Sequence, residues 1–334
     1  SKFHLLDLKK NKEVILPELP VGQVYGISFS PDNKKLSLVL NIATSPGDVY
    51  IYNLESNKLV RWTESEVGGL NTANFVMPEL IHYPTFDKVD GKVRQIPAFV
   101  YKPKNVNGPL PVLISIHGGP ESQFNPYFSS TYQFWANELG IAIIAPNVRG
   151  SSGYGKSYLK LDNGFKREES VKDIGKLLDW IESQKDFDPK RVGVFGGSYG
   201  GYMVLASMTN YNDRLACGVD IVGISNFVTF LKNTKEYRRD LRRVEYGDER
   251  DPKMEAFLQK ISPNNNAHKI TKPLFVVQGL NDPRVPASEA EQIVAKIREN
   301  KGDVWYMLAK DEGHGFRKKT NRDHYTAAVV LFLE

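Results

Sequence analysis

From Glu79 onward, the sequence alternates between short runs that are apolar at nearly every position and segments with the apolar spacing of helices. Strands that are apolar throughout are typical of a parallel sheet, because helices cover both of its faces. The expected strands are 96–101, 112–116, 141–145, 192–195, 217–222, 274–278 and 304–308. This alternation predicts an α/β fold with a mostly parallel, doubly wound sheet.

Two of the segments between these runs indicate how the helices pack. One of them carries a single apolar stripe, formed by Val171, Ile174, Leu177, Leu178 and Ile181. In the other, Ser288 and Glu291 form a capping-box pattern at the expected start of a helix. Because reactive groups of such folds gather at the carboxyl ends of the strands, the residues that follow each apolar run are the first candidates for a site.

The N-terminal stretch contains a repeat, because residues 3–16 align with residues 49–62 at an offset of 46. Strands are expected at 24–29, 36–42, 49–53 and 58–62, and four short strands in such a period are typical of a β-propeller blade. We therefore expect a partial propeller at 1–78, with the end of one blade and one complete blade, and a catalytic domain at 79–334. Since blades bury their faces against one another, the chain is expected to be the C-terminal part of a longer protein. A small β appendage on the larger domain is the alternative.

Composition excludes several classes of protein. Of 334 residues, 41% are hydrophobic and 25% charged, which is typical of a globular chain and not of a disordered one. No run approaches the ~18 apolar residues of a membrane span, and the single cysteine excludes an internal disulfide framework. The net charge of +5 is spread along the chain, so neither a nucleic-acid nor a membrane partner is expected. The compartment stays open, with the cytoplasm favoured and the periplasm as the alternative.

A serine stands at the junction between an expected strand and an expected helix. The strand 192–195 leads into Gly196-Gly197-Ser198-Tyr199-Gly200-Gly201, and a helix is expected from about Tyr202. This G-x-S-x-G pattern is typical of a sharp turn that lifts a nucleophilic hydroxyl clear of the sheet. The glycines two residues before and after the serine avoid the clashes that a Cβ would make there. A glycine-rich loop with an ordinary serine is the alternative.

An acid and a base follow the serine along the chain. In hydrolases with a G-x-S-x-G turn, the order is serine, acid, histidine. Asp282 comes just after the strand 274–278, and His314 just after the strand 304–308. A serine hydroxyl needs a base to accept its proton, and the base needs a third group to orient it. We therefore expect Ser198, His314 and Asp282 to form a triad, with Asp311 and Glu312 as competing acids.

Backbone N–H groups are expected to form an oxyanion site beside the nucleophile. His117-Gly118-Gly119-Pro120 follows the strand 112–116, and its glycines allow a substrate to approach the backbone closely. The N–H of Tyr199 and the N–H of Gly119 are the expected donors, with Gly118 as the next choice for the second.

These motifs together resemble the α/β-hydrolase domain of the prolyl oligopeptidase family of serine peptidases, and its acylaminoacyl-peptidase-like branch is the closer match. The signatures are HGGP at 117–120, NVRGSSGYG at 147–155, GGSYGG at 196–201, GLNDPRVP at 279–286 and DEGHGF at 311–316. The resemblance implies an α/β-hydrolase fold behind an N-terminal propeller. It implies the nucleophile Ser198, the acid Asp282, the base His314 and the oxyanion donors Gly119 and Tyr199. Some members place a tyrosine hydroxyl in the oxyanion site, where this sequence has His117.

Three further stretches have competing interpretations. Residues 150–157 match the phosphate-binding pattern G-x-x-x-x-G-K-S, but the expected strand ends too early and the family loop explains the same residues. Residues 232–251 are rich in arginine with interleaved acids, which favours a solvated, salt-bridged helix over an anion-binding one. Phe227 and Phe230 are predicted from position alone to line a substrate pocket.

The sequence thus predicts a serine hydrolase that cleaves short, N-acylated or free, peptides through an acyl-enzyme, without a cofactor or a metal. A carboxylesterase of the same fold is one alternative, and a non-catalytic interaction module is another. Expected partners are a peptide or ester substrate, and either a second copy of the chain or an N-terminal propeller portion.

Overall fold

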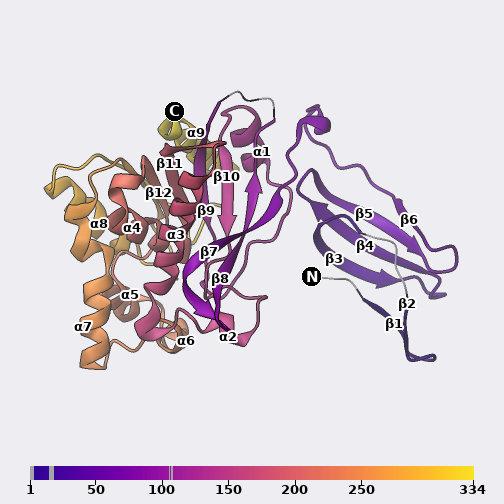
Figure 1. The fold of residues 1–334 in the computed structure, drawn as a ribbon, viewed down its shortest axis with the longest axis horizontal. Coiled ribbons are helices and arrows are strands. Elements are labelled where there is room, and N and C mark those ends of the chain that lie inside the picture. Colours follow the sequence, from indigo (N-terminus) through magenta and orange to yellow (C-terminus); the bar gives the residue numbers. More distant parts are fainter. Residues whose placement is uncertain (1–3, 15–18, 105, 107) are drawn as a thin grey trace.

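The computed structural model describes residues 4–14, 19–104, 106 and 108–334, which form two parts (Figure 1). A large α/β part contains the α-helices α1 to α9. A smaller antiparallel sheet, formed by N-terminal residues, lies beside it. No helix within these residues combines the length and the apolar character needed to cross a membrane.

The α/β part is built on an eight-stranded sheet in the order β14-β13-β12-β11-β9-β10-β8-β7. From β14 to β10 neighbouring strands run parallel, whereas β8 pairs antiparallel with β10, and β7 with β8. The strands are β7 (Glu79–Val89), β8 (Lys92–Tyr101), β9 (Leu110–Ile116), β10 (Ala142–Pro146), β11 (Phe187–Gly197), β12 (Cys217–Ile221), β13 (Leu274–Gly279) and β14 (Val304–Ala309). The predicted α/β fold is confirmed, although β7 was not expected as a strand.

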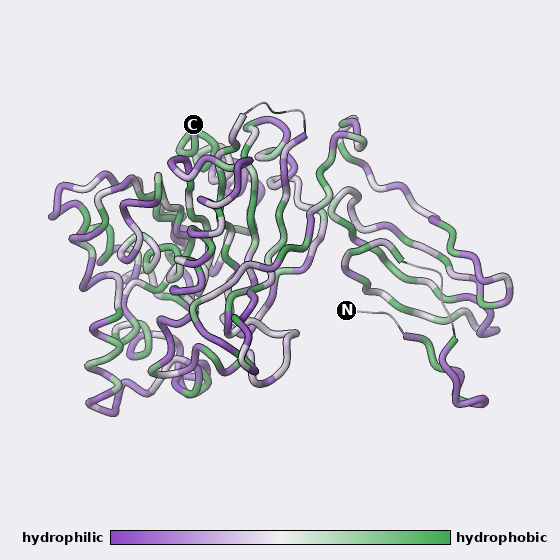
Figure 2. The backbone as a smooth tube through the Cα atoms, viewed as in Figure 1, coloured by the Kyte–Doolittle hydropathy of each residue, from purple (hydrophilic) through white to green (hydrophobic). Residues whose placement is uncertain are grey.

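Helices cover both faces of this sheet, because alternate strand residues pack on opposite sides. Ile114 packs in a cluster with α3, α4 and α8, while its neighbour Leu113 packs with α1 and α9. The helices are α1 (Ser130–Asn137), α2 (Lys156–Leu159), α3 (Glu169–Ser183), α4 (Tyr199–Asn210), α5 (Phe227–Asn233), α6 (Glu236–Tyr246), α7 (Pro252–Ile261), α8 (Ala287–Glu299) and α9 (Lys319–Leu333). Figure 2 shows the hydrophobic residues concentrated along the strands between these layers. The core therefore lies on both sides of one sheet, as expected for apolar strands.

The two helix predictions have different outcomes. The stripe from Val171 to Ile181 is buried along α3, so that helix is confirmed. The capping box is wrong, because α8 begins at Ala287 after Pro286 and Ser288 lies inside its first turn without a capping hydrogen bond.

The N-terminal part holds a hairpin and a four-stranded antiparallel sheet. β1 (Leu5–Asp7) pairs with β2 (Lys12–Val14), and the sheet contains β3 (Gly22–Phe29), β4 (Lys35–Ile42), β5 (Ser45–Asn53) and β6 (Lys58–Arg61) in sequential order. Residues 3, 15 and 16 of the predicted repeat lie outside the described residues. The boundary at 78/79 and the assignment to a propeller stay predictions.

The hairpins β1–β2 and β5–β6 match each other at the offset of the repeat. Asp7 pairs with Lys12, and Asn53 pairs with Lys58, in the same antiparallel register. The turn asparagines, Asn11 and Asn57, both have positive φ, at 45° and 55°. Two turns with the same left-handed residue at the same position are what a structural repeat predicts, because asparagine tolerates this conformation better than most residues.

The small sheet is fixed to the α/β part through α1. The Asn41 side chain accepts a hydrogen bond from the N–H of Phe128 at 2.7 Å. The buried amide of Gln133 donates to the carbonyl oxygen of Ala43 at 3.0 Å and accepts from the N–H of Val76 at 2.7 Å. One glutamine therefore joins the β4–β5 turn and the segment before β7 to the same helix.

Candidate active site

Ser198 lies on a tight turn between the end of β11 and the start of α4. Its backbone has φ 60° and ψ −120°, a conformation that residues with a side chain rarely adopt. The N–H of Ser198 donates to the carbonyl oxygen of Ile221 at 2.8 Å, which ties the turn to β12. A Cβ on Gly200 would lie 2.2 Å from the carbonyl oxygen of Ile116. The turn therefore needs glycine after the serine for the steric reason inferred from the sequence.

Asp282 and His314 are brought together by the two loops that follow β13 and β14. The Nδ1 atom of His314 lies 2.7 Å from the Oδ2 atom of Asp282, within hydrogen-bond distance. The other oxygen of Asp282 accepts from the N–H groups of Arg284 and Val285 at 2.8 and 3.0 Å. The N–H of Asn281, in the loop after β13, donates to the carbonyl oxygen of Glu312, in the loop after β14, at 2.9 Å. This hydrogen bond holds the two loops side by side. The Asp282 carboxylate is thereby fixed on both of its oxygens.

The competing acids, Asp311 and Glu312, are bound to other groups. Asp311 pairs with Lys318 at 2.5 Å, and this ion pair lowers the pKa of the Asp311 carboxyl. Glu312 accepts hydrogen bonds from the N–H groups of Arg317 and Lys318 at 3.0 and 2.9 Å. Among the acids that the sequence left open, Asp282 is the one hydrogen-bonded to His314.

Ser198 and the Asp282–His314 pair share the carboxyl edge of the sheet. In addition to the strand pairing of β12 with β13, the N–H of Val222, just after β12, donates to the carbonyl oxygen of Val277 in β13 at 2.8 Å. Hydrogen bonds thus connect the ends of β11, β12, β13 and β14 in sequence. Among the described residues, however, no hydrogen bond joins the Ser198 hydroxyl to the His314 imidazole. Such bonds are often long in unliganded hydrolases and tighten when substrate binds.

The loop after β9 lies against the serine turn. A Cβ on Gly118 would be 3.0 Å from the carbonyl oxygen of Gly197 and 3.3 Å from the Cβ of Ser198. Gly119 has φ +132°, and a Cβ there would lie 2.8 Å from the backbone nitrogen of Glu121. In the described part of the chain, the N–H groups of Gly119 and Tyr199 donate to no protein acceptor. Two free donors therefore stand on the two segments that meet at Ser198.

Helix α6 reaches this loop, which the sequence analysis did not anticipate. The carbonyl oxygen of Gly119 accepts from Arg242 Nη1 at 3.1 Å and from the Tyr246 hydroxyl at 3.3 Å. Glu245, also on α6, pairs with Arg242 and is buried, and this burial raises the pKa of its carboxyl. The salt-bridged character predicted for 232–251 is correct, but the prediction of a merely solvated helix is wrong for these three residues. Tyr237 of the same helix is exposed, as expected for a surface helix. Nothing in the sequence of α6 indicates that its other face contacts the loop after β9.

Phe227 and Phe230 do not line a pocket. Their exposed fractions are 0% and 2%, and both rings pack on Tyr246 within the core, with centroids 5.2 and 5.9 Å away. The predicted pocket role is therefore wrong for direct contact with a substrate. Position in the sequence placed these rings near the site, but the direction of α5 turns them inward.

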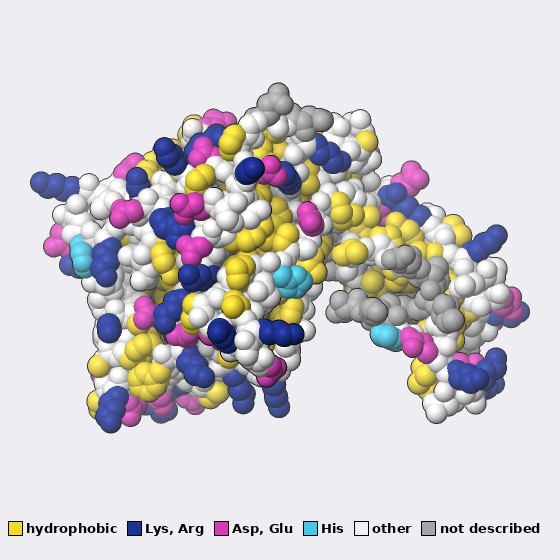
Figure 3. Space-filling model, viewed as in Figure 1, with side chains coloured by type: hydrophobic (Ala, Val, Ile, Leu, Met, Phe, Trp, Pro, Cys, Tyr) yellow, Lys and Arg dark blue, Asp and Glu magenta, His cyan; other side chains and the backbone are white. Residues whose placement is uncertain are grey.

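The phosphate-binding interpretation of 150–157 finds no support in the loop geometry. A Cβ on Gly150 would lie 2.3 Å from Oδ1 of Asp162, so a carboxylate already packs against this backbone. Figure 3 shows acidic and basic side chains interspersed over much of the visible face. Within the described residues, no group of three or more His, Cys, Asp or Glu side chains could hold a metal ion.

Residues 126–334 match the family model of the prolyl oligopeptidase family. The chain belongs to the prolyl oligopeptidase family. It is 36% identical over 232 residues to dipeptidyl aminopeptidase BIII of Pseudoxanthomonas mexicana, an alignment that covers 68% of this chain and 33% of that protein. Dipeptidyl peptidase family member 6 of Caenorhabditis elegans is 35% identical over 230 residues, which cover 68% of this chain and 31% of that protein. The predicted family resemblance is confirmed.

A solved structure extends the likeness to the N-terminal part. A puromycin-hydrolysing peptidase from Mycobacterium tuberculosis superposes on 99% of this chain with a TM-score of 0.86, at 23% identity, and the match covers 50% of its own chain. At that identity the likeness shows the fold, and it includes the small antiparallel sheet. The chain spans about a third of the length of the two relatives and half of this structure.

At His117 the sequence resemblance predicts a departure from family members that have a tyrosine. The Nε2 atom of His117 lies 2.9 Å from the Ser151 hydroxyl, and its Nδ1 atom lies 2.7 Å from the carbonyl oxygen of Gly118. Burial lowers the pKa of the His117 imidazole, which favours the neutral ring at pH 7. Both ring nitrogens of His117 are therefore engaged by its own loop and by the loop that carries Ser151.

Proposed function

We propose that this chain supplies the catalytic part of a serine peptidase, in which Ser198, His314 and Asp282 act as a triad. The observation that carries the proposal is the 2.7 Å contact between His314 Nδ1 and Asp282 Oδ2 at the sheet edge where Ser198 stands on its positive-φ turn. Family membership supports the same assignment, because residues 126–334 include all three side chains.

The proposed reaction begins when the Ser198 hydroxyl attacks the carbonyl carbon of a peptide. His314 Nε2 accepts the hydroxyl proton, while the Nδ1–H bond to Asp282 holds the tautomer that leaves Nε2 free to accept. The tetrahedral intermediate collapses as His314 donates that proton to the leaving amine, which leaves an acyl-enzyme on Ser198. Water then attacks the ester in the same way and regenerates the hydroxyl.

The N–H groups of Gly119 and Tyr199 stabilise the oxyanion in this proposal. Negative charge develops on the carbonyl oxygen as the serine attacks, and donors already oriented toward that position need no rearrangement. Removal of one such donor typically lowers the rate by about 10²- to 10³-fold. Both donors are backbone groups, so their placement depends on the side chains that hold each segment.

The proposed substrates are short peptides. The named relatives are dipeptidyl peptidases, and the sequence resemblance also favours N-acylated peptides. A carboxylesterase is the second candidate, because an ester needs the same nucleophile, base and oxyanion donors. Turnover of matched free-amino, N-acetylated and ester substrates distinguishes them, and a peptidase is expected to cleave at least one amide. Turnover of p-nitrophenyl esters with no amide cleaved would select the carboxylesterase.

Residues 1–78 are proposed to be part of a β-propeller. Their proposed partner is either the remaining blades of that propeller or a second copy of the chain. Tyr25, Ile27 and Phe29 of β3 support this, because they are 47%, 50% and 49% exposed on one sheet. A stable monomer in sedimentation at all concentrations would leave the propeller portion as the proposed partner.

Labelling by a fluorophosphonate probe tests the triad. The wild-type chain is expected to form a covalent adduct that Ser198→Ala abolishes, and kcat should fall by about 10⁶-fold if the triad acts as a unit. Ser288→Ala, an exposed serine on α8, is the control and should label like the wild type. Absent labelling of the folded wild-type chain would favour the non-catalytic interaction module.

A further inference from the structure

A fully buried guanidinium lies next to the proposed site but takes no part in the proposed chemistry. Arg167 follows a 3₁₀ turn at Gly164–Lys166, and its exposed fraction is 0%. Its Nη1 atom lies 2.7 Å from Oδ2 of Asp162, which is also fully buried. A buried ion pair of this kind adds little net stability on average, because desolvation offsets the attraction. Its presence therefore needs a further explanation.

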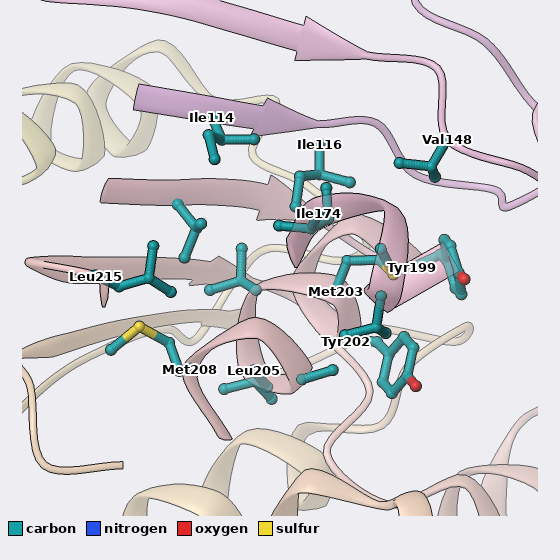
Figure 4. Packing of buried hydrophobic residues seen from close by; sticks show 14 of the residues in the cluster. Ile114, Ile116, Val148, Ile174, Tyr199, Tyr202, Met203, Leu205, Met208 and Leu215 are labelled. Atoms are coloured by element: carbon teal, nitrogen blue, oxygen red, sulfur yellow. The ribbon is translucent and has the colours of Figure 1, made fainter. Parts of the chain in front are cut away.

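Arg167 touches the residue that follows the nucleophile. Its Nη1 atom donates to the Tyr199 hydroxyl at 3.2 Å, and the guanidinium carbon lies 5.3 Å from the centre of the Tyr199 ring. The same hydroxyl lies 2.8 Å from the Ser170 hydroxyl and donates to Asp162 Oδ2 at 3.1 Å. Figure 4 shows the Tyr199 side chain at the start of α4, packed beside Met203. The side chain of Tyr199 is thus held at its tip, while its backbone N–H is the proposed oxyanion donor.

Arg167 also touches the helix that holds the second donor. Its Nη2 atom donates to the carbonyl oxygen of Glu245 at 2.7 Å, and its guanidinium carbon lies 4.8 Å from the Tyr246 ring centre. The Tyr246 hydroxyl donates to the carbonyl oxygen of Gly119, the residue whose N–H is the other proposed donor. The rings of Tyr199 and Tyr246 are stacked, 6.1 Å apart with an interplanar angle of 15°.

We propose that Arg167 is a positioning residue for the oxyanion site, which holds the Tyr199 and Gly119 donors at a fixed separation. Its Nη1 and Nη2 atoms bind the Tyr199 hydroxyl and the carbonyl oxygen of Glu245 at once. The planar guanidinium holds these two groups at a fixed spacing, which a point charge does not. Asp162 holds the guanidinium in place. This inference rests on the proposed function, because it assigns a role in the same reaction.

Arg167→Lys is the direct test, because it keeps a cation beside Asp162 but cannot reach Tyr199 and Glu245 together. We expect kcat to fall by about 10- to 100-fold, below the loss for a missing donor, with KM changed less than about 2-fold. The affinity for a peptidyl trifluoromethyl ketone, which forms a tetrahedral oxyanion on the serine, should weaken by the same factor as kcat. A merely structural role would not move these two quantities together.

Arg149→Lys is the matched control. Arg149 forms a nearly buried ion pair with Asp173, at 2.8 Å, and its hydrogen bonds reach neither Tyr199 nor Tyr246. We expect this variant to lower the thermal midpoint without changing the affinity for the trifluoromethyl ketone. Equal losses of that affinity in both lysine variants would overturn the proposal.

Tyr246→Phe keeps the test decisive if Arg167→Lys does not fold. It removes the hydroxyl that contacts Gly119 and leaves the ring in place, and it should weaken ketone binding by about 10-fold. Wild-type ketone affinity in this variant would overturn the inference alone, since the wild type would still be an active peptidase. A wild type that neither labels with fluorophosphonate nor binds the ketone would instead refute the proposed function and, with it, this inference.

Discussion

Replacement of Asp220 by asparagine should stabilise the protein in a pH-dependent way. Asp220 lies in β12 with 1% of its surface exposed, and its Oδ1 atom occupies the space that a Cβ on Gly223 or Gly201 would need, at 2.0 and 2.2 Å. Among the described residues, this oxygen has no hydrogen-bond partner. Burial raises the pKa of the carboxyl to about 7; the backbone N–H of Gly223 opposes the shift, and the charge of nearby Glu289 adds to it.

The sign and size of the effect follow from the two pKa values. The carboxyl titrates near 3.8 in the unfolded chain and at about 7 in the folded protein, a difference worth about 4 kcal/mol. Below pH ~4 both states are protonated, so the raised pKa has no effect. Between about 4 and 7 the unfolded chain binds fewer protons than the folded protein, and stability falls as the pH rises. Asp220→Asn should therefore gain about 4 kcal/mol between pH 4 and pH 8.

Urea unfolding followed by tryptophan fluorescence measures this difference, because Trp135, Trp180 and Trp305 all lie in the α/β part. The free energy of unfolding of Asp220→Asn minus that of the wild type is determined from pH 4 to pH 8. Asp303→Asn, an exposed carboxylate at the start of β14, is the control and should give a difference near zero throughout. A gain for Asp220→Asn that stays constant with pH, or shrinks as the pH rises, would refute the reasoning.

Two further substitutions test packing, one at the Ser198 turn and one at the junction with the N-terminal sheet. Gly200→Ala puts a Cβ 2.2 Å from the Ile116 carbonyl oxygen and should lower stability by about 3 kcal/mol, whereas Gly197→Ala, whose Cβ meets its nearest atom at 3.6 Å, should lose less in a comparison of thermal midpoints. Similar midpoints for both would contradict the steric argument. Gln133→Leu leaves buried backbone groups of the N-terminal sheet junction unpaired, at about 1–3 kcal/mol for each, and should speed hydrogen exchange in β4 and β5, while exposed Gln95→Leu should not; unchanged exchange would contradict the assigned role.

The fold and the pair of Asp282 and His314 were predictable from the sequence for local reasons. Runs that are apolar at nearly every position predict covered parallel strands, and parallel strands bring the residues after them to one edge. The glycines around Ser198 report a turn that the backbone geometry confirms. These signals lie within a few residues of the atoms they describe, and long-range packing does not alter them.

The side chains around the site were not predictable, because their destination depends on how distant elements approach. Arg167 stands in Lys166-Arg167-Glu168, a stretch that has the composition of a solvated surface, yet its guanidinium is fully buried. Phe227 was predicted from its position alone to line a pocket, and it packs in the core instead. Sequence periodicity records which face of a helix is apolar, but not which element will cover it.

Several buried charges of the α/β part lie in the loops at the carboxyl edge of the sheet, beside the proposed site, whereas Asp48 is buried in the N-terminal sheet. Arg149 and Asp173, and Arg167 and Asp162, fill the connection between β10 and α3. Glu289 lies at the start of α8 and binds the N–H groups of the loop after β12. Each such group loses hydration on folding, so apolar packing would hold these loops at a smaller cost. Apolar packing lacks direction, however, whereas hydrogen bonds to fixed charges set the position of a backbone donor. The distribution of buried charge is therefore explained if the loops at this edge must be placed accurately for the reaction.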